Sequence, residues 1–462
     1  MPSSEYELQR SRHVADFLAQ VPDHLARVEW TEEQIGAERR DRLRELLGVA
    51  KERSPWHHER LADVDTEVFE EDDLKALPVM TKDDVMDHFD EIVTDRRVTL
   101  AAANAHIEKL ASDDYFLGDL HAVASGGSSG RRGVFIYGWK AWTTSFVGFV
   151  RFTLRDMLDD PELAGLPTIV GVVAADHAWH MTSAQAQTFS SPFTEAHRFP
   201  VTMPVREIVE GLNRLRPTGL VAYASALGML VEEERAGRLH IAPKRVTSTS
   251  EPLLPEIRAQ AEETWGAPVG NWWGTSEGGP TGVGCFRGPG MHLSDDLLII
   301  EAVDETGHLV GPGGTASKIY LTNLFNPIQP LIRYELTDEV TFIEAPCPCG
   351  SAHARVEDIQ GRLDDRFVYA EGVAAHPHLF RSVLSREPAI VEYQVCQKPD
   401  GAEILVVPSG SFDSRRLGSE IEAALKRLGV HRPTASFRTV DRIERQVIGK
   451  LKRFVPLGQS GQ

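Results

Sequence analysis

A run of glycine and serine, residues 125–133, carries the densest chemical signal in the sequence. It reads Ser-Gly-Gly-Ser-Ser-Gly-Arg-Arg-Gly and comes directly before the strand-like residues 134–137. Glycine lets backbone N–H groups converge on an anion, serine hydroxyls add donors, and Arg131 or Arg132 adds positive charge. The run predicts a phosphate loop, although it lacks the Walker A spacing and a flexible surface loop would have the same composition. The residues expected to contact phosphate are Ser125, Gly127, Ser128, Ser129, Gly130 and Arg131.

A second turn, residues 271–279, combines two tryptophans, small hydroxyls and a carboxylate in the order Asn-Trp-Trp-Gly-Thr-Ser-Glu-Gly-Gly. Aromatic rings can stack on a purine, and the carboxylate of Glu277 can hold Mg²⁺. The alternative is a pair of core tryptophans beside a surface glutamate. The turn alone leaves both interpretations open.

Three further segments carry groups suited to a nucleotide and its reaction. Residues 249–252 form a Thr-Ser-Glu-Pro turn, and residues 331–338 read as a strand that ends on Asp338. An acid in that position can bind the two hydroxyls of a ribose. Near the end of the chain, Lys450 follows a glycine and supplies a cation.

The cysteines suggest a metal site. Cys285 and His292 form Cys-x6-His, and Cys347 and Cys349 form Cys-x-Cys, so that three thiolates and one imidazole are available. This Cys₃His set suits structural Zn²⁺. The alternative is reduced cysteines in loops, because Cys-x-Cys is tighter than the common zinc spacing. Cys396 stands apart from the set.

The composition is that of a folded chain that avoids polyanions. The 462 residues (51.2 kDa) favour about three compact units, or one large and one small. Hydrophobic residues make up 42% and charged residues 25%, the balance of a globular protein. The 49 basic and 68 acidic side chains give a net charge of −19, which argues against nucleic-acid binding.

Compartment and membrane expectations also follow from the sequence. Apolar runs fall short of the ~20 residues that span a bilayer. The N-terminus lacks a secretory pattern, and four cysteines are too few for a disulfide framework. We therefore expect a cytoplasmic protein with reduced thiols and no membrane contact.

Helical and strand patterns must position these chemical groups. Residues 1–100 read as a mostly helical lead-in, with Thr81 expected to cap a helix. From about 120 to 345, short apolar runs alternate with helical stretches, which is typical of an α/β architecture. Buried strands are expected at 168–174, 219–223, 297–303 and 318–322. Later, strands at 390–395 and 403–407 and a helix at 414–428 indicate a smaller α+β unit.

In chain order, these segments resemble the adenylate-forming enzymes (acyl-CoA synthetases, peptide-synthetase adenylation domains and luciferases), and among them the phenylacetate–CoA ligases. The run 125–133 is similar to the family's glycine-rich phosphate loop, with Arg131 for Lys and Arg132 for Pro. The other matches are 249–252 to G-x-E-P, 273–277 to Y-G-x-T-E, 333–338 to R-Y-R-T-G-D, 361–365 to G-R-x-D-D, and 449–450 to the catalytic lysine motif. Trp273 replaces the Tyr of one motif, and Thr337 a Gly of another.

The resemblance implies a role for each matching residue. Glu277 would coordinate Mg²⁺, and Asp338 would accept hydrogen bonds from the ribose, with Arg362 nearby. Lys450 would bridge the substrate carboxylate and the α-phosphate. Nucleotide contacts are also implied for Ser250, Glu251, Pro252, Trp272, Trp273, Gly274 and Thr275.

The resemblance also implies a domain organisation. A large multi-sheet α/β domain that binds ATP and the acid, residues 1–361, would precede a small α+β lid, residues 362–462. The lid would rotate at Asp364 and Asp365 between the two halves of the reaction.

The implied activity is that of an AMP-forming acid–thiol ligase. A small aromatic carboxylic acid would react with ATP to give an acyl-adenylate and pyrophosphate, and then with CoA. One alternative is a biosynthetic ligase with a different acceptor, such as an amine, a carrier-protein thiol or another small nucleophile. A second is a non-catalytic nucleotide-binding protein, which the presence of Glu277 and Lys450 disfavours. A homodimer is a further expectation.

In this family the acid lies between the central strands, where several residues of this chain could line an aromatic slot. The candidates are His177, Trp179, His180, Tyr223, Gly278 and Gly279. Any single histidine among them could equally be a satisfied core residue. Some phenylacetate–CoA ligase relatives carry a Cys…His…Cys-x-Cys cluster, which supports the zinc interpretation.

Overall fold

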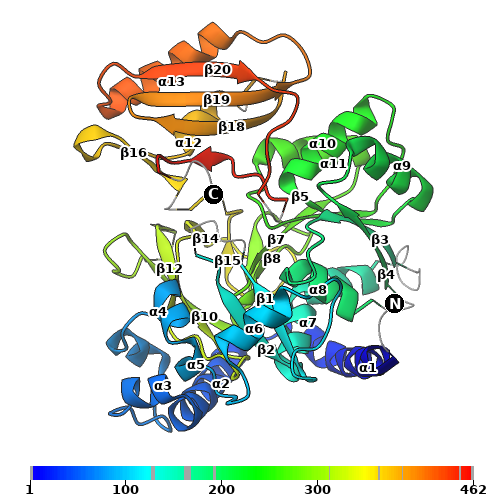
Figure 1. Cartoon of the computed structure of the whole chain (residues 1–462). Helices are drawn as coiled ribbons and strands as arrows, with labels where there is room; N and C mark the ends of the chain where they lie inside the picture. The colour runs from blue at the N-terminus through cyan, green and yellow to red at the C-terminus, as the bar shows by residue number, and fades with distance from the viewer. Residues whose placement is uncertain are drawn as a thin grey trace.

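The computed structural model describes residues 4–125, 131–160, 168–190, 194–311, 313–359, 361–362, 365–384, 386–387, 389–446 and 449–458. The chain is an α/β protein with a large multi-sheet N-terminal part and a smaller C-terminal part, which Figure 1 shows one above the other. None of the described helices is long and apolar enough to cross a bilayer.

A ten-stranded sheet, ordered β11-β14-β15-β9-β8-β7-β6-β5-β3-β4, forms the centre of the large part. Neighbours run parallel from β4 to β7 and antiparallel from β7 to β11. The strands are β3 (Thr168–Ala174), β4 (Thr194–Pro200), β5 (Gly219–Tyr223), β6 (Arg245–Thr249), β7 (Val269–Thr275), β8 (Gly279–Val283), β9 (Met291–Leu293), β11 (Thr315–Ala316), β14 (Val340–Ile343) and β15 (Arg355–Val356). The strands predicted at 168–174 and 219–223 are confirmed. Because β5, β6 and β7 are parallel, their carboxyl ends meet at one edge, where open α/β sheets bind ligands.

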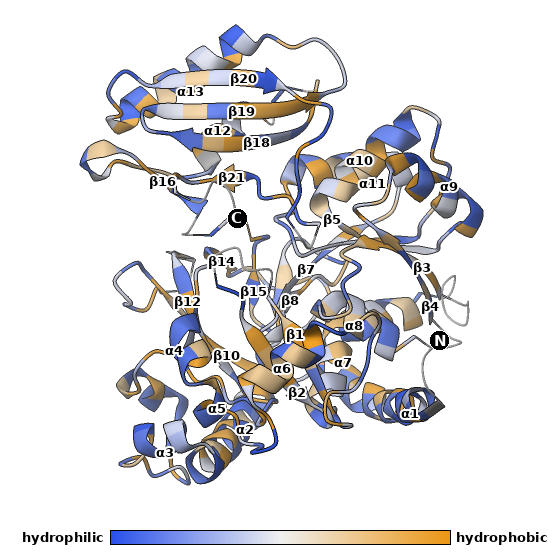
Figure 2. Ribbon diagram, viewed as in Figure 1, coloured by the Kyte–Doolittle hydropathy of each residue, from blue (hydrophilic) through white to orange (hydrophobic). Residues whose placement is uncertain are grey.

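Helices cover both faces of the parallel half (Figure 1). One face packs against α9 (Val205–Leu215), α10 (Ala224–Arg235) and α11 (Pro255–Trp265) in a core of their own. Close packing explains Gly171 of β3, where a Cβ would lie 2.8 Å from Leu212 of α9. The other face carries α7 (Trp139–Leu158), α8 (Met181–Thr188) and α1 (Ser4–Arg27). In Figure 2, α9 mixes hydrophilic and hydrophobic residues, as a helix with one face on a sheet should.

Two smaller sheets and a set of short helices complete the large part. The sheets are β1 (Leu120–Ala124) with β2 (Val134–Gly138), and β10 (Leu298–Val303) with β12 (Lys318–Asn323) and β13 (Tyr334–Leu336). The helices are α2 (Glu32–Arg53), α3 (Pro55–Arg60), η1 (Glu71–Ala76), α4 (Lys82–Asp87), α5 (Phe89–Ile92) and α6 (Leu100–Ile107). Thr81 caps α4 as predicted, since its Oγ1 accepts from the Asp84 N–H at 3.2 Å. The strands expected at 297–303 and 318–322 correspond to β10 and β12.

The C-terminal part is built on a four-stranded sheet, ordered β20-β19-β18-β21, and has its own core. Its elements are β16 (Phe367–Val368), η3 (Ala370–Gly372), β17 (Ala374–Ala375), α12 (His378–Leu384), β18 (Ile390–Lys398), β19 (Gly401–Pro408), α13 (Ser414–Leu428), β20 (Thr434–Thr439) and β21 (Phe454–Val455). The helix predicted at 414–428 is confirmed, with Asp413 at its N-cap and Gly429 at its left-handed C-cap. We propose that the boundary between the two parts lies between residues 361 and 362.

Candidate active site

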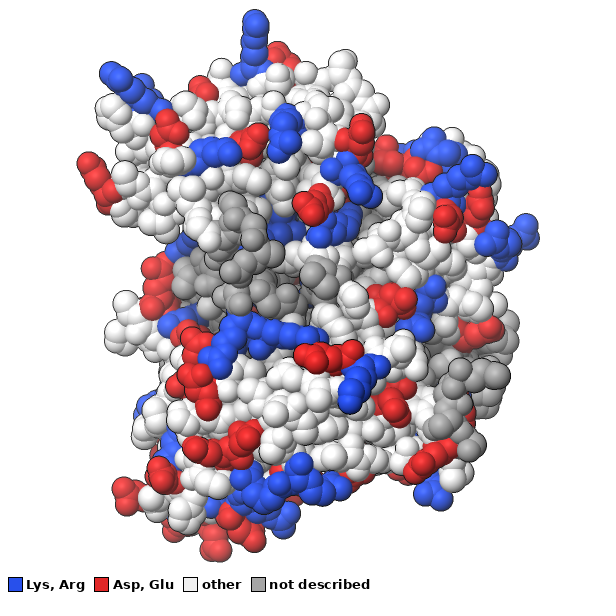
Figure 3. Space-filling view, in the orientation of Figure 1, with Lys and Arg blue, Asp and Glu red and all other residues white. Residues whose placement is uncertain are grey.

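A cavity of about 1640 Å³ lies at the carboxyl edge of the parallel strands and reaches into the C-terminal part. Its described walls include residues from each motif of the sequence: Ser125, Arg131, Ser250, Glu251, Pro252, Trp272, Trp273, Gly274, Thr275, Glu277, Asp338, Arg362 and Lys450. On the face drawn in Figure 3, acidic and basic side chains are interspersed. The net charge of −19 is therefore not gathered into one acidic patch on that face.

The base of the glycine–serine run is closed by hydrogen bonds. The Ser125 N–H donates to the Gly133 carbonyl at 2.8 Å, and Ser125 Oγ accepts from the Gly133 N–H at 2.9 Å. Arg131 donates to Asp83 (3.2 Å) and Asp87 (2.8 Å) of α4, so its charge is already shared with two carboxylates. The predicted ligands Gly127, Ser128, Ser129 and Gly130 lie outside the described residues.

The two tryptophans of β7 lie in the cavity wall beside a tightly packed glycine. Trp273 is buried and Trp272 half-buried, and neither indole N–H has a hydrogen-bond partner among the described residues. A Cβ at Gly274 would lie 2.7 Å from the ring of Phe149, so only glycine fits there without a shift. The tryptophans thus pack in the core and also border the cavity. Core packing and a face open to a ligand, the two interpretations left open by the sequence, are therefore compatible.

Glu277 is a buried carboxylate at the cavity wall, with 8% of its surface exposed. Burial raises its pKa, and the positive charges of Lys82 and Arg362 oppose that rise. Tyr334 donates its hydroxyl to Glu277 Oε1 at 3.5 Å, and Asn323 fixes the backbone by donating to the Glu277 carbonyl at 3.0 Å. Sequence reasoning missed Lys82 and Tyr334, although Tyr334 lies inside a quoted motif.

Asp338 and Arg362 meet although 24 residues separate them. Their backbones form an antiparallel bridge, and Arg362 Nε donates to Asp338 Oδ1 at 3.3 Å. The Asp338 charge raises the pKa of Arg362 further, so the guanidinium stays protonated. Asp338 Oδ2 is buried and has no hydrogen-bond partner among the described residues. A buried acceptor without a partner is costly, and a ligand hydroxyl would satisfy it.

Lys450 reaches the same cavity from the C-terminal part. Burial, reinforced by the charge of Arg362, lowers the pKa of its ammonium to about 8. The nearby carboxylates Glu251, Asp338 and Glu277 oppose this shift. Lys450 is therefore a cation at neutral pH that can lose its charge within an accessible pH range.

Lys450 is held by a set of contacts that we call the clasp, formed by Ser225, Glu251, Glu392, Arg445 and the Leu451 N–H. Glu251 accepts from the Ser225 N–H (2.9 Å) and from the Leu451 N–H (2.7 Å). Arg445 donates to Ser225 Oγ (2.7 Å) and to Glu392 Oε1 (2.7 Å). The carboxylate predicted to lie beside adenine therefore also ties the lysine segment to α10. No local pattern in the sequence indicates a role for Arg445, because its partners are 220 and 53 residues away.

The candidates for the acid pocket are dispersed. Of these six, His180 is the one among the described cavity-lining residues, and burial with the charge of Lys450 lowers its pKa to about 3, so it is neutral. The ring of His177 stacks on Trp179 (4.9 Å between centroids), and the Arg132 guanidinium lies 4.2 Å from the Trp179 ring centroid. Tyr223 is fully buried.

The glycine candidates and the hinge have other surroundings. A Cβ at Gly278 would lie 2.6 Å from Leu321, and one at Gly279 would lie 2.6 Å from Ser145 Oγ. Both glycines thus allow close packing of the turn behind the wall. Asp365 lines the cavity and donates its N–H to the Arg362 carbonyl at 3.0 Å, whereas Asp364 lies outside the described residues.

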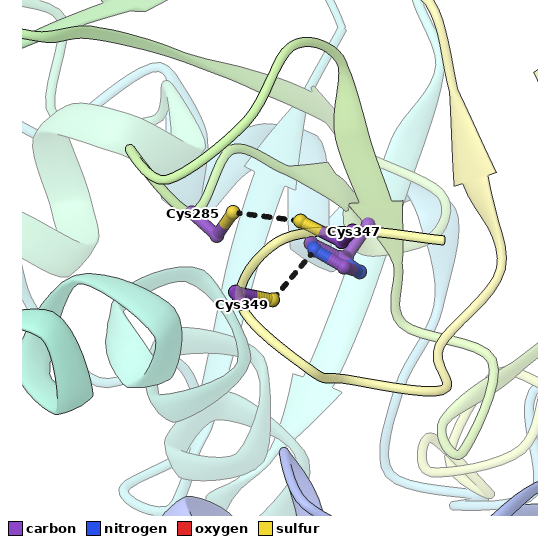
Figure 4. Close-up of side chains that lie close together, drawn as sticks. Cys285, Cys347 and Cys349 are labelled. Carbon is purple, nitrogen blue, oxygen red and sulfur yellow. Dashed lines mark hydrogen bonds between the residues drawn. The ribbon is translucent and has the colours of Figure 1, made fainter. Parts of the chain in front are cut away.

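The predicted zinc ligands converge on one point (Figure 4), and none of the four is among the described residues that line the cavity. Their ligand atoms all lie within 4.8 Å of one another. Cys285 Sγ is 3.5 Å from Cys347 Sγ, and Cys349 Sγ is 3.3 Å from His292 Nε2. Zn–S bonds of about 2.3 Å in a tetrahedron place two sulfurs roughly 3.8 Å apart, which is close to the observed spacing. Hydrogen bonding holds the pKa of the Cys349 thiol well below its usual range.

A second buried cluster, formed by Asp295, Asp296 and His353, is already neutralised by protein groups. Arg151 donates to both oxygens of Asp296 (2.8 and 2.7 Å), and both side chains are fully buried. His353 Nδ1 is hydrogen-bonded to Asp295, and its Nε2 to the Arg27 carbonyl (3.0 Å). This network joins α1, α7 and the β9–β10 segment, and it serves as structure.

Comparison with known proteins gives a partial match in sequence. No family model matches the chain. It is 34% identical over 182 residues to a phenylacetate–coenzyme A ligase of Thermus thermophilus, covering 37% of this chain and 40% of that protein. It is 23% identical over 252 residues to protein CapK of Staphylococcus aureus, covering 53% and 54%. The chain thus spans about half or less of the length of these curated relatives.

The fold match is far more extensive. A 2-hydroxyisobutyryl-CoA ligase in the postadenylation state, in complex with an acyl-AMP, gives a TM-score of 0.74 over 93% of this chain and 91% of that one, at 19% identity. The same ligase in the thioesterification state, with CoA, gives 0.60. An anthranilate CoA ligase in complex with anthranoyl-AMP gives 0.50 over 72% of this chain and 65% of that one, at 15% identity. Of these two structures of the same ligase, this chain is more similar to the one in the postadenylation state. The resemblance drawn from the motifs is confirmed, and the chain has the fold of the adenylate-forming ligases.

Proposed function

We propose that the protein is an AMP-forming acid–CoA ligase of the phenylacetate–CoA ligase-like branch. The observation that carries this proposal is the meeting of Lys450 with Glu277, Asp338 and Arg362 in one cavity. Each of these residues comes from a different segment. Lys450 and Arg362 supply positive charge, Glu277 supplies a buried carboxylate, and Asp338 supplies the acceptor oxygen without a partner among the described residues. The relatives that act on acids and CoA support the same reaction.

ATP would occupy the wall of the cavity built by β7 and the segment around Asp338. The free Oδ2 of Asp338 suits a ribose hydroxyl, and the base would lie against the tryptophans and the 250–252 turn. Aromatic faces and buried acceptors of this kind recognise a nucleoside without a net positive surface. The triphosphate would extend toward Ser125.

Magnesium fits this donor set. Glu277 offers a hard carboxylate oxygen that is buried and carries an unfavourable desolvation cost, which a cation would relieve. When bound, Mg²⁺ supplies charge neutralisation to the phosphates. Tyr334 donates to the carboxylate, and Asn323 fixes the backbone that carries it.

The first half of the reaction joins two anions. A carboxylate oxygen attacks the α-phosphorus, the bond to the β-phosphate oxygen breaks, and pyrophosphate leaves with acyl-AMP retained. Lys450 contributes by lying between the carboxylate and the α-phosphate, where its ammonium stabilises the developing charge. His180 is neutral beside it and adds no competing cation.

In the second half, the sulfur of CoA attacks the acyl carbon, AMP leaves, and the thiol proton is lost to solvent. Lys450 and its segment would then withdraw to admit the thiol. We propose that the C-terminal part rotates at the 364–365 hinge, a domain movement that gates the two halves.

ATP–pyrophosphate exchange across a panel of carboxylic acids tests the proposal. We expect exchange with at least one acid, and AMP release that depends on CoA. Exchange together with AMP release that does not depend on CoA would point to a different acceptor. Absence of exchange with every acid would overturn the ligase assignment.

We further propose that Cys285, His292, Cys347 and Cys349 hold a structural zinc ion. Four protein ligands leave no open position, as in structural rather than catalytic sites. The ion would join the β8–β9 turn to the loop after β14. His292 Nδ1 lies 3.3 Å from the His353 carbonyl, the kind of second contact that fixes the orientation of a metal-bound imidazole.

Zinc content tests this site. Protein purified without chelator should contain about one equivalent of zinc. Cys349→Ser should weaken zinc binding on the order of 100-fold or more and lower the thermal midpoint, because a thiolate ligand is lost. Cys396→Ser is the matched control, since Cys396 lies on β18 away from the cluster and should retain the metal. A parent protein with less than about half an equivalent would contradict the site.

A further inference from the structure

The cavity continues beyond the nucleotide wall into a passage that we call the α7 channel. It runs between α7 and the face of β3 and β5, from His180 near the active site to Met157. Val170 and Val221 line its sheet side. Gly171 faces α9, so its neighbours along β3 must point to the opposite face, toward α7.

One stripe of α7 lines the channel along most of the helix. Phe146, Val150, Leu154 and Met157 recur every three or four residues and so share one face. At 1.5 Å of rise per residue, this stripe is about 16 Å long. Thr168 and Gly219, the first residues of β3 and β5, also line the cavity, so the channel runs from the carboxyl edge of the sheet toward the amino edge.

The stripe is apolar and yet incompletely packed. All four of its side chains are half-buried, whereas Val147 on another face of α7 is fully buried. Protein interiors are close-packed, so apolar side chains that face inward and keep accessible surface border empty space. An internal apolar cavity of this kind binds apolar ligands.

Aromatic rings form one wall of the channel. Phe17 of α1, Phe146 and Phe189 lie against one another, with centroid distances of 5.3, 4.5 and 5.4 Å. Near the same end of α7, Phe149 lies 5.6 Å from Trp272, where the channel joins the nucleotide site. The channel is therefore continuous with the site that Lys450 enters.

We propose that the acid substrate carries an elongated, straight apolar tail that lies along the α7 channel, with its carboxylate at Lys450. This inference rests on the proposed function and names its substrate class. The sequence favoured a small aromatic acid, but a single ring beside His180 would leave most of the stripe uncovered. A flexible hydrocarbon tail covers it, and each buried methylene adds a similar gain in affinity.

A chain-length series tests this inference. In the pyrophosphate exchange assay, kcat/KM should rise about fourfold per methylene from butanoate through dodecanoate and level off when the channel is full. Dodecanoate should exceed phenylacetate and benzoate. Exchange that is best with the aromatic acids and falls with chain length would overturn the inference, while the ligase function would stand.

Two bulky substitutions, at different distances from His180, test the direction in which the acid lies along the channel. Val150→Trp should abolish the gain for long acids, whereas Met157→Trp, farther from His180 along the channel, should shorten the preferred length by a smaller amount. Leu8→Trp, on an exposed position of α1, is the control and should change neither. Equal loss for all acid lengths in the two channel variants would contradict the channel.

Binding without turnover keeps the two proposals distinguishable. Calorimetry with dodecanoate, in the absence of ATP, should show binding to the parent protein and at least tenfold weaker binding to Val150→Trp. This result would support the channel even if no acid gave exchange. A parent protein that binds no dodecanoate would overturn it, and thermal midpoints of the variants would confirm that they are folded.

Discussion

Lys450→Ala should lower the rate of adenylation by a factor of about 10²–10³, because a preorganised cation at the reacting phosphate is lost. Thioester formation from preformed acyl-adenylate should continue, since Lys450 would have left the site by then. Pyrophosphate exchange measures the first half, and CoA-dependent AMP release from added adenylate measures the second.

The same lysine predicts a pH dependence. Its pKa is lowered to about 8 by burial and by Arg362, so the ammonium is present below that pH and lost above it. We expect kcat/KM for exchange, which reports the free enzyme, to fall as pH rises through about 8. Lys450→Arg keeps its charge at every accessible pH, so its remaining activity should lack this alkaline decline.

Lys426→Ala provides the control for both measurements. Lys426 lies in the last turn of α13, exposed and in the same part of the chain. The Lys426→Ala substitution should leave the rate of pyrophosphate exchange and its pH profile unchanged. Normal exchange by Lys450→Ala would remove the lysine from the mechanism.

Glu277→Gln should reduce adenylation by a similar factor of about 10²–10³, because an amide oxygen replaces the charged ligand proposed for Mg²⁺. The substitution preserves shape and the contact with Tyr334, so the fold should persist. The distinguishing readout is a magnesium titration, in which the variant should need far more Mg²⁺ for half-maximal exchange.

Glu263→Gln is the matched control. Glu263 lies on α11, is exposed, and pairs with Arg235 at 3.1 Å. The magnesium dependence of pyrophosphate exchange in Glu263→Gln should equal that of the parent protein. An unchanged magnesium requirement in Glu277→Gln would assign the carboxylate to positioning alone.

Local signals in the sequence predicted local structure well. The helix at 414–428 has an Asp before it and a Gly after it, so its ends are fixed by residues within a few positions. The Thr81 cap depends on four residues in a row. The strand at 219–223 is a short apolar run between turns, which requires no knowledge of its neighbours.

The site was predictable where known motifs group residues that lie far apart in the sequence. No periodicity would bring Asp338 to Arg362; the ordered resemblance to a known superfamily implied that they lie together. The clasp was missed because Arg445 and Ser225 belong to no motif. The α7 channel was missed because the sequence shows Val150 and Leu154 as ordinary core residues, and only packing distinguishes a filled interior from an empty one.

The candidates for the acid pocket show the same limit. His177 and Trp179 lie in a segment rich in binding-type residues, but their rings stack with each other and with Arg132. Gly278 and Gly279 serve close packing in the turn. Residue type predicted that this region approaches the cavity, while the direction of each side chain depended on the tertiary fold.

The clasp has a consequence for the timing of the proposed reaction. The bonds from Glu251 and Arg445 that steady Lys450 for the first step are the ones that must open before the thiol can enter. The strength of the clasp therefore sets how the duration of each turnover is shared between formation of the acyl-AMP and transfer of its acyl group. A tighter clasp would lengthen the lifetime of the enclosed acyl-AMP. A looser clasp would allow faster acyl transfer but would slow the adenylation step.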